Sequence, residues 1–206
     1  MTNTDDSRGR GQPGGDLAGL SARFGRIPTG RGPAPVDDWH PPFCGDIDMR
    51  IDAEGVWSYG GTPIGREAMV KLFASILRRE PDGRTVLVTP VEMCAIRVDD
   101  VPFVAVEMKV EGGGVDQRLV FRTNVDDVVT ADAAHPLRFS VDPRNHGLKP
   151  YLTVRGGLEA RLARPVLYDL VELGDEASVD GHRWFGVWSG GRFWPILPVA
   201  DIEAVA

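Results

Sequence analysis

Cysteine is scarce in this chain, which has 2 cysteines among 206 residues. Cys44 and Cys94 lie far apart and form no C-x-x-C pair. Two such residues do not make a disulfide framework, and no metal-binding spacing accompanies them. Both are therefore expected to be buried small hydrophobic residues without a redox role.

Long apolar runs are also missing. The N-terminus has no apolar stretch of signal-peptide length, and no stretch elsewhere is long enough to cross a bilayer. We therefore expect a cytoplasmic protein that has no membrane partner.

Positive charge is in short supply, because 23 Lys and Arg stand against 30 Asp and Glu, for a net charge of −7. General nucleic-acid binding needs a basic face that displaces counterions, so this balance argues against it. A local basic pocket stays open, because net charge says nothing about its distribution.

Motifs for catalysis and for cofactors are absent as well. There is no P-loop and no G-x-G-x-x-G spacing, and Ser189 is one position away from a G-x-S-x-G frame. The four histidines show no metal-ligand spacing. The sequence therefore predicts no cofactor, no metal and no catalytic residue, and a hydrolase built on His135 and Asp142 is the least favoured alternative.

What the chain does contain is 42% hydrophobic residues, enough for one large domain or two small ones. Residues 1–36 are rich in Gly and Pro and are expected to form a mostly disordered N-terminal arm, with one short helix over residues 16–24.

Residues 37–113 are predicted to form a first α+β unit. Alternating polar and apolar residues over 46–51 indicate a half-buried strand, and the turn at 52–55 starts a hairpin. An apolar stripe over 67–79 predicts the best helix of the chain. The glycines of the bend at 111–114 mark the predicted boundary between units.

Residues 114–206 are predicted to form a second α+β unit. A short helix is expected over 158–163, where Pro165 would end it. Strands are expected over 119–124, 128–131, 137–141, 151–154, 166–173, 183–189 and 192–196.

Several short identities recur in the same order along the two units. VLxxxVE occurs at 86–92 and again at 166–172, and Val-Asp occurs at 98–99 and at 179–180. This order predicts a duplicated fold of class α+β, in which each unit is a mostly antiparallel sheet with one helix.

Four segments together resemble a bacterial family known as domain of unknown function 1285. They are WHPPFCGDIDMRI at 39–51, GGTPI at 60–64, LVTPVE at 87–92 and YLTVR at 151–155. The resemblance implies a duplicated α+β architecture whose C-terminal half is loosely similar to pleckstrin-homology folds. It also implies a nucleotide-like ligand between the domains and a role in signalling under oxidative stress.

Two predicted helix starts carry an arginine beside free backbone N–H groups, which is the physical basis of an anion site. These are Gly65-Arg66 and Arg155-Gly156-Gly157. The alternative is that the arginines pair with surface carboxylates and the glycines only form turns.

A third candidate is Arg122-Thr123-Asn124 at the end of a predicted strand, where planar donors and an amide are available to a base or a phosphate. The alternative is a strand terminus in which Asn124 stabilises the following turn.

The function favoured by these patterns is a non-catalytic regulatory protein that binds a small anionic or nucleotide-like ligand. Two similar units create a cleft at their interface, and Arg66, Arg122 and Arg155 are expected to face it. A protein-interaction module that forms a homodimer is the main alternative.

Overall fold

The computed structural model describes residues 34–143 and 147–203, together with Gly19 and Phe24. The prediction of a disordered arm and of a helix over 16–24 falls almost entirely outside these residues. Phe24 itself is fully buried, and its ring packs edge-on against Phe73 with 5.8 Å between ring centroids. The segment before residue 34 therefore contributes at least one side chain to the core.

The first unit is a six-stranded sheet with the order β3-β2-β1-β6-β5-β4. Its central strands β1 and β6 run parallel, and every other neighbouring pair is antiparallel. The strands are β1 (Phe43–Ile51), β2 (Trp57–Tyr59), β3 (Thr62–Pro63), β4 (Leu77–Arg79), β5 (Thr85–Val88) and β6 (Met93–Val98). A short 3-10 helix, η1 (Val36–Asp38), precedes the sheet.

The second unit is also a six-stranded sheet, with the order β10-β11-β12-β7-β8-β9. Here β7 and β12 form the central parallel pair, and the other pairs are antiparallel. The strands are β7 (Phe103–Glu111), β8 (Arg118–Thr123), β9 (Val128–Thr130), β10 (Leu137–Val141), β11 (Leu148–Arg155) and β12 (Leu158–Leu162).

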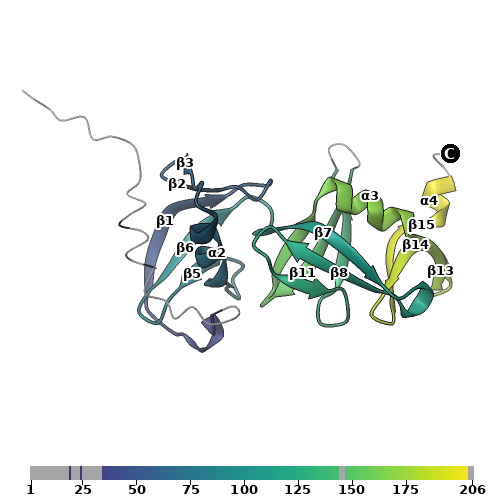
Figure 1. The fold of residues 1–206 in the computed structure, drawn as a ribbon, viewed down its shortest axis with the longest axis horizontal. Coiled ribbons are helices and arrows are strands. Elements are labelled where there is room, and N and C mark those ends of the chain that lie inside the picture. The colour runs from purple at the N-terminus through teal and green to yellow at the C-terminus, as the bar shows by residue number, and fades with distance from the viewer. Residues whose placement is uncertain (1–18, 20–23, 25–33, 144–146, 204–206) are drawn as a thin grey trace, which may run out of the picture.

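The two sheets have the same topology. In each, the first and last strands lie side by side in the centre, and three-strand meanders extend to either side. The predicted duplication of an α+β unit is thereby confirmed. Figure 1 shows the units one after the other along the longest axis, with a smaller third sheet beyond them.

The residue matches that suggested the duplication are nevertheless wrong in detail. Residues 86–88 lie in β5, whereas 166–172 belong to the helix α3 (Arg164–Glu172). The same short apolar pattern thus forms a strand in one unit and a helix in the other. In the second unit Arg164 and Pro165 begin this helix, which is where proline is tolerated.

The helix predicted over 158–163 is the strand β12 instead. Leu158, Ala160 and Leu162 are buried and alternate with half-buried residues, which is the period of a strand. Gly156 and Gly157 have φ of +50° and +72° and form the tight turn between β11 and β12.

The helix predicted over 67–79 is shorter, because α2 (Glu67–Ser75) ends before β4 begins. Leu77 pairs with Leu87 of β5, and both side chains are fully buried. Leu77, at the end of the apolar stripe, is therefore buried as part of the sheet and not as part of the helix.

The change from one sheet to the next falls between β6 and β7, not at the predicted bend at 111–114. The reason is that β7 pairs with β8 and β12 of the second sheet and with no strand of the first. The stretch 111–114 instead comprises the end of β7 and the start of the hairpin connection to β8, and this connection contains the short 3-10 helix η2 (Gly114–Asp116).

The third sheet consists of β13 (Asp175–Val179), β14 (His182–Ser189) and β15 (Arg192–Pro198), followed by α4 (Val199–Glu203). The buried hydroxyl of Ser189 joins it to the second sheet, since it donates to the carbonyl oxygen of Ala131 and accepts the N–H of Leu119. One continuous hydrophobic core extends through both units and this sheet.

In the described part of the chain, no helix is long and apolar enough to span a membrane. The helices α2 and α3 have nine residues each. Of the two cysteines, Cys94 is buried as expected, whereas Cys44 is exposed, because the first residues of β1 lie at the surface.

Candidate functional site

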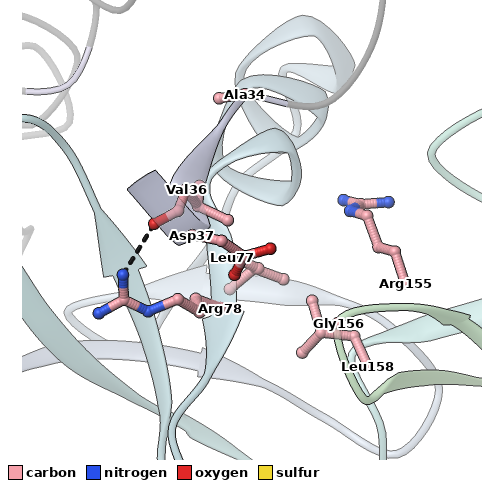
Figure 2. A pocket seen from close by; sticks show the side chains of 8 residues that line it. All are labelled: Ala34, Val36, Asp37, Leu77, Arg78, Arg155, Gly156 and Leu158. Atoms are coloured by element: carbon pink, nitrogen blue, oxygen red, sulfur yellow. Dashed lines mark hydrogen bonds between the residues drawn. The ribbon is translucent and has the colours of Figure 1, made fainter. Parts of the chain in front are cut away.

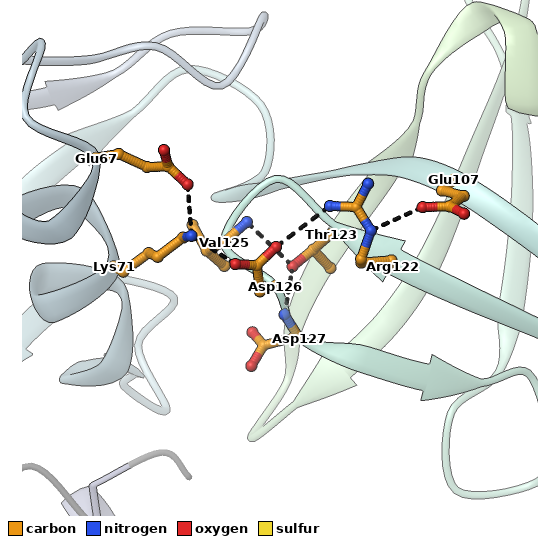
Figure 3. Close-up of polar contacts among 8 residues, drawn as sticks. All are labelled: Glu67, Lys71, Glu107, Arg122, Thr123, Val125, Asp126 and Asp127. Carbon is orange, nitrogen blue, oxygen red and sulfur yellow. Dashed lines mark hydrogen bonds and ion pairs between the residues drawn. The ribbon is translucent and has the colours of Figure 1, made fainter. Parts of the chain in front are cut away.

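The contacts between the first and second units, which we call the seam, include an ion-pair chain (Figure 3). Lys71 of α2 lies 2.5 Å from Glu67 on its own helix and 2.5 Å from Asp126 in the turn between β8 and β9. Arg122 continues the chain, with 3.2 Å from Nη1 to Asp126 and 2.8 Å from Nε to Glu107. Charges of both signs therefore alternate across this part of the seam.

The chain of charges shifts the pKa values of Lys71, Arg122 and Asp126. The hydrogen bond from Lys71 lowers the pKa of Asp126, and the same contact raises the pKa of Lys71. The hydrogen bond to Glu107 raises the pKa of Arg122. Lys71, Asp126 and Arg122 are thus held in their charged forms by neighbours, and Arg122 contacts two carboxylates.

Thr123 and Asn124 hold the turn after β8. The fully buried hydroxyl of Thr123 accepts the N–H groups of Val125 and Asp127. Asn124 Oδ1 accepts the N–H of Val104 at 3.0 Å, and the N–H of Asn124 donates to the Val104 carbonyl at 2.8 Å. The Thr123 hydroxyl and the Asn124 side-chain oxygen are therefore used in structural contacts.

Arg155, at the end of β11, connects the two units. Its Nη1 forms an ion pair with Asp127, and its Nη2 donates to the carbonyl oxygen of Ala74 near the end of α2, at 2.8 Å. The guanidinium also lies over the Phe103 ring, 4.9 Å from its centroid. These two hydrogen bonds to described residues use two of the five N–H donors of the guanidinium, which leaves the others for a ligand.

A pocket of about 180 Å³ lies beside Arg155, between η1, β4 and the β11–β12 turn, and we call it the interdomain pocket. Both units contribute to it, through Ala34, Val36, Asp37, Leu77, Arg78, Arg155, Gly156 and Leu158. Figure 2 shows Arg155 across the pocket from Val36 and Asp37.

Arg78 lines the same pocket but turns its guanidinium away from Arg155 (Figure 2). Its nitrogens bind Glu80 Oε1 at 2.6 Å and the carbonyl oxygens of Val36 and Trp39 at 2.7 Å. Among the described lining residues, Arg155 thus keeps more unused guanidinium donors than Arg78, and it lies across the pocket from the exposed Asp37.

Only some of the residues predicted from the sequence line the interdomain pocket. Arg155 and Gly156 line the interdomain pocket, whereas Gly157 forms the other half of the turn outside its lining. Arg66 is exposed at the N-cap of α2 and is not part of the lining. The second helix start, expected after Arg155, is wrong, because Arg155 precedes a hairpin turn and a strand.

Asp37, Arg78 and Asp127 were missed from sequence. Asp127 follows the turn-forming Asp126, and the sequence indicates that turn. The ion-pair partner of Asp127 is Arg155, which is 28 positions away in the sequence. Arg78 falls within the helix that the sequence predicts over 67–79. The helix ends at Ser75, so Arg78 belongs to a strand that borders the pocket.

The residues of the hydrolase alternative have separate partners. His135 Nδ1 lies 3.2 Å from Asp132 Oδ1, and the buried Asp142 forms an ion pair with Lys149 at 2.9 Å. Within the ranges that the structure describes, no group of three or more His, Cys, Asp or Glu is arranged to hold a metal ion.

Comparison with known proteins matches two family models to consecutive parts of the chain. Residues 34–101 match the domain of unknown function (DUF1285), N-terminal domain, and residues 102–196 match the protein of unknown function (DUF1285), C-terminal domain. The border between the models coincides with the change from the first sheet to the second. Among curated proteins, none matches the chain.

Two solved structures are similar to the chain. A DUF1285 family protein from Silicibacter pomeroyi DSS-3 is 49% identical, with a TM-score of 0.82 over 89% of this chain and 97% of the other. A second one, from Shewanella baltica OS155, is 27% identical, with a TM-score of 0.49 over 61% of this chain and 91% of the other.

Proposed function

The chain belongs to the DUF1285 family, and from the geometry of its seam we propose that it is a non-catalytic protein that binds a small anionic ligand in the interdomain pocket. The observation that carries the proposal is Arg155, whose guanidinium stands at the edge of a pocket to which both units contribute. Pockets at domain interfaces are frequent ligand sites. A guanidinium with spare donors suits a carboxylate or a phosphate.

The size and charge of the pocket restrict the class of ligand that it can bind. Its volume of about 180 Å³ is below the range of roughly 300–1,000 Å³ that is typical for drug-sized ligands. A whole nucleotide is therefore too large, and a small carboxylate is favoured. Asp37 on the opposite wall disfavours a dianion and favours a ligand with a positive group at its other end, such as an amino acid.

A regulatory role follows from the position of the pocket. A ligand that touches η1 and β4 of one unit and the β11–β12 turn of the other favours the arrangement in which all three are close. Binding would then stabilise the seam, and a partner protein that recognises this arrangement would respond to the ligand. Signal transduction in the cytoplasm is the cellular role that we propose on this basis.

The first test is a thermal-shift screen, because a ligand that binds only the folded chain raises its melting temperature. The panel contains amino acids, small monocarboxylates, inorganic phosphate and AMP. We expect stabilisation by one or more of the small compounds and none by AMP. Backbone amide shifts in NMR spectra should then change at Val36, Gly156 and Leu158.

A pair of variants separates ligand binding from folding. Arg155→Met removes the guanidinium, whereas Asp127→Asn weakens the same ion pair but leaves the guanidinium in place. Both should lower stability, yet only Arg155→Met should abolish binding. The proposal fails if no compound changes the amide shifts around the pocket, or if the Arg155→Met chain binds as well as wild type.

A further inference from the structure

A second and larger pocket lies wholly within the second unit, where β12 leads into α3, and we call it the β12–α3 pocket. Its volume is about 540 Å³, within the range of roughly 300–1,000 Å³ that is typical of small-molecule sites. The main side chains of its lining are Lys149, Arg161, Leu162, Arg164, Leu167 and Tyr168. Among the described residues, none from the first unit belongs to this lining, so the pocket does not depend on the seam.

Three of these residues are cationic, although the chain as a whole carries a net charge of −7. Lys149 is paired with the buried carboxylate of Asp142. Across the described ranges, no carboxylate lies within ion-pair distance of Arg161 or Arg164. At the seam, by contrast, Arg122 and Arg155 each have a carboxylate partner.

The Arg164 side chain is held in place without a carboxylate. Its Nε donates to the Tyr168 hydroxyl at 2.8 Å, one helical turn along α3, and its guanidinium lies 5.6 Å from the centroid of the Tyr168 ring. These contacts leave the outer guanidinium nitrogens without a partner of opposite charge among the residues described. A positioned guanidinium loses less conformational entropy when it binds an anion.

The same pocket also offers apolar surface. Leu162 and Leu167 lie in the lining, and Tyr168 beside them is 54% exposed as a residue. An exposed aromatic ring next to aliphatic side chains suits a flat apolar group, which can pack against the ring. The pocket thus combines a cationic rim with an apolar wall.

We propose that the β12–α3 pocket binds an organic anion, in which a phosphate or carboxylate group is attached to an apolar planar body. Arg161 and Arg164 bind the charged group, and the body packs against Tyr168 and Leu167. Inorganic phosphate lacks the apolar part and therefore binds more weakly than an aryl phosphate. This ligand class is larger and more apolar than the one proposed for the interdomain pocket.

The test uses NMR titration of the full chain with phenyl phosphate, benzoate, inorganic phosphate and phenol. Phenyl phosphate or benzoate is expected to shift the amides of Leu162, Arg164 and Tyr168 in a saturable way. Inorganic phosphate and phenol should each bind at least about tenfold more weakly, because each lacks one half of the contacts.

Arg164→Glu is the deciding variant, and Arg192→Glu is its matched control. Arg192 is likewise exposed, and its guanidinium lies 5.4 Å from the Trp194 ring, but it is outside the pocket. We expect Arg164→Glu to weaken binding of phenyl phosphate by about tenfold or more and Arg192→Glu to leave it unchanged. Equal losses in both variants would indicate general charge attraction and overturn the proposal, as would the absence of saturable shifts. Arg155→Met should not affect this titration, so failure here is distinguishable from failure of the interdomain site.

Discussion

Lys71 on α2 reaches across the seam to Asp126 of the second unit, with 2.5 Å between Nζ and Oδ2. The pair joins a helix of one unit to a turn of the other at a place where both residues are accessible to water. Such pairs contribute little to the free energy of unfolding because water screens them. The protonation of Asp126 can, however, be used to test whether the two units are in contact.

The pKa of Asp126 should depend on Lys71. The hydrogen bond from Lys71 lowers this pKa, so Lys71→Met is expected to raise it toward the ordinary carboxyl value of about 3.9. Carboxyl ¹³C shifts followed by NMR against pH would measure it. Arg122 also lowers the pKa, so part of the shift should remain in the variant; an unchanged value would show that the units are not in contact in solution.

Acid should weaken the seam for the same reason. A carboxyl whose pKa is lower in the folded than in the unfolded chain adds stability above its unfolded pKa. That contribution is lost as the pH falls through the lowered folded value of Asp126. The difference in stability between wild type and Lys71→Met should therefore be present at neutral pH and vanish in strong acid, as urea unfolding at several pH values would show.

Removal of Arg155 should destabilise the chain more than removal of its charge partner. Arg155→Met loses the Asp127 ion pair, the bond to the Ala74 carbonyl and the contact with Phe103. We expect a loss of about 2 kcal/mol in the free energy of unfolding, against about 1 kcal/mol for Asp127→Asn. Urea denaturation measures both, and equal losses would mean that the bond to Ala74 is unimportant.

The hydroxyl of Tyr151 should lose its proton only at a pH above the ordinary range for tyrosine. Burial, followed by the hydrogen bond from its hydroxyl to Asp100 at 3.0 Å, raises the pKa of Tyr151 to about 12. Because the folded pKa exceeds the unfolded value, the associated stability is present below about pH 10 and is lost as the pH rises toward 12.

The Asp100→Asn variant tests the cause of that shift. It removes the charge but not the burial, so the pKa of Tyr151 should fall yet stay above the ordinary value of about 10. NMR titration of the tyrosine ring would follow it. A pKa that does not change would assign the whole shift to burial.

Gly55 should tolerate alanine worse than Gly61 does. Both have positive φ, +81° and +74°, so a side chain is strained at either position. A Cβ on Gly55 would also lie 2.7 Å from a methyl group of Val104 in the second unit, whereas Gly61 has nothing within 4 Å. Gly61→Ala should cost about 1–2 kcal/mol and Gly55→Ala clearly more in urea denaturation. Equal costs would contradict the close packing of the β1–β2 turn on Val104.

The sequence predicted the parts of this fold that depend on local pattern. The apolar stripe identified α2, and the turn at Gly55 identified the β1–β2 hairpin. The strand β12 was misassigned, because a short apolar run cannot be told from a helix by periodicity alone. Gly156 and Gly157, which form the hairpin turn before β12, are the better indication of a strand at this place.

The candidate site was less predictable, because its partners are distant in sequence. Arg155 was recognised, but its contact with the Ala74 carbonyl joins residues 81 positions apart, and that pairing follows from packing of the two units. Arg122 has the same residue type and a similar context, yet it is held by two exposed carboxylates. The residue type alone does not show that Arg155 lines a pocket and that Arg122 is held by carboxylates.

The parallel pairing of first and last strands also determines how each unit responds to a pulling force. The chain enters the second unit at the start of β7 and leaves its sheet at the far end of β12, and these strands lie side by side in the same direction. Tension between those two ends acts along the pair as shear, so the connecting hydrogen bonds are loaded together instead of opening one after another. The repeated topology thus places one mechanically resistant clamp in each unit, in series along the chain.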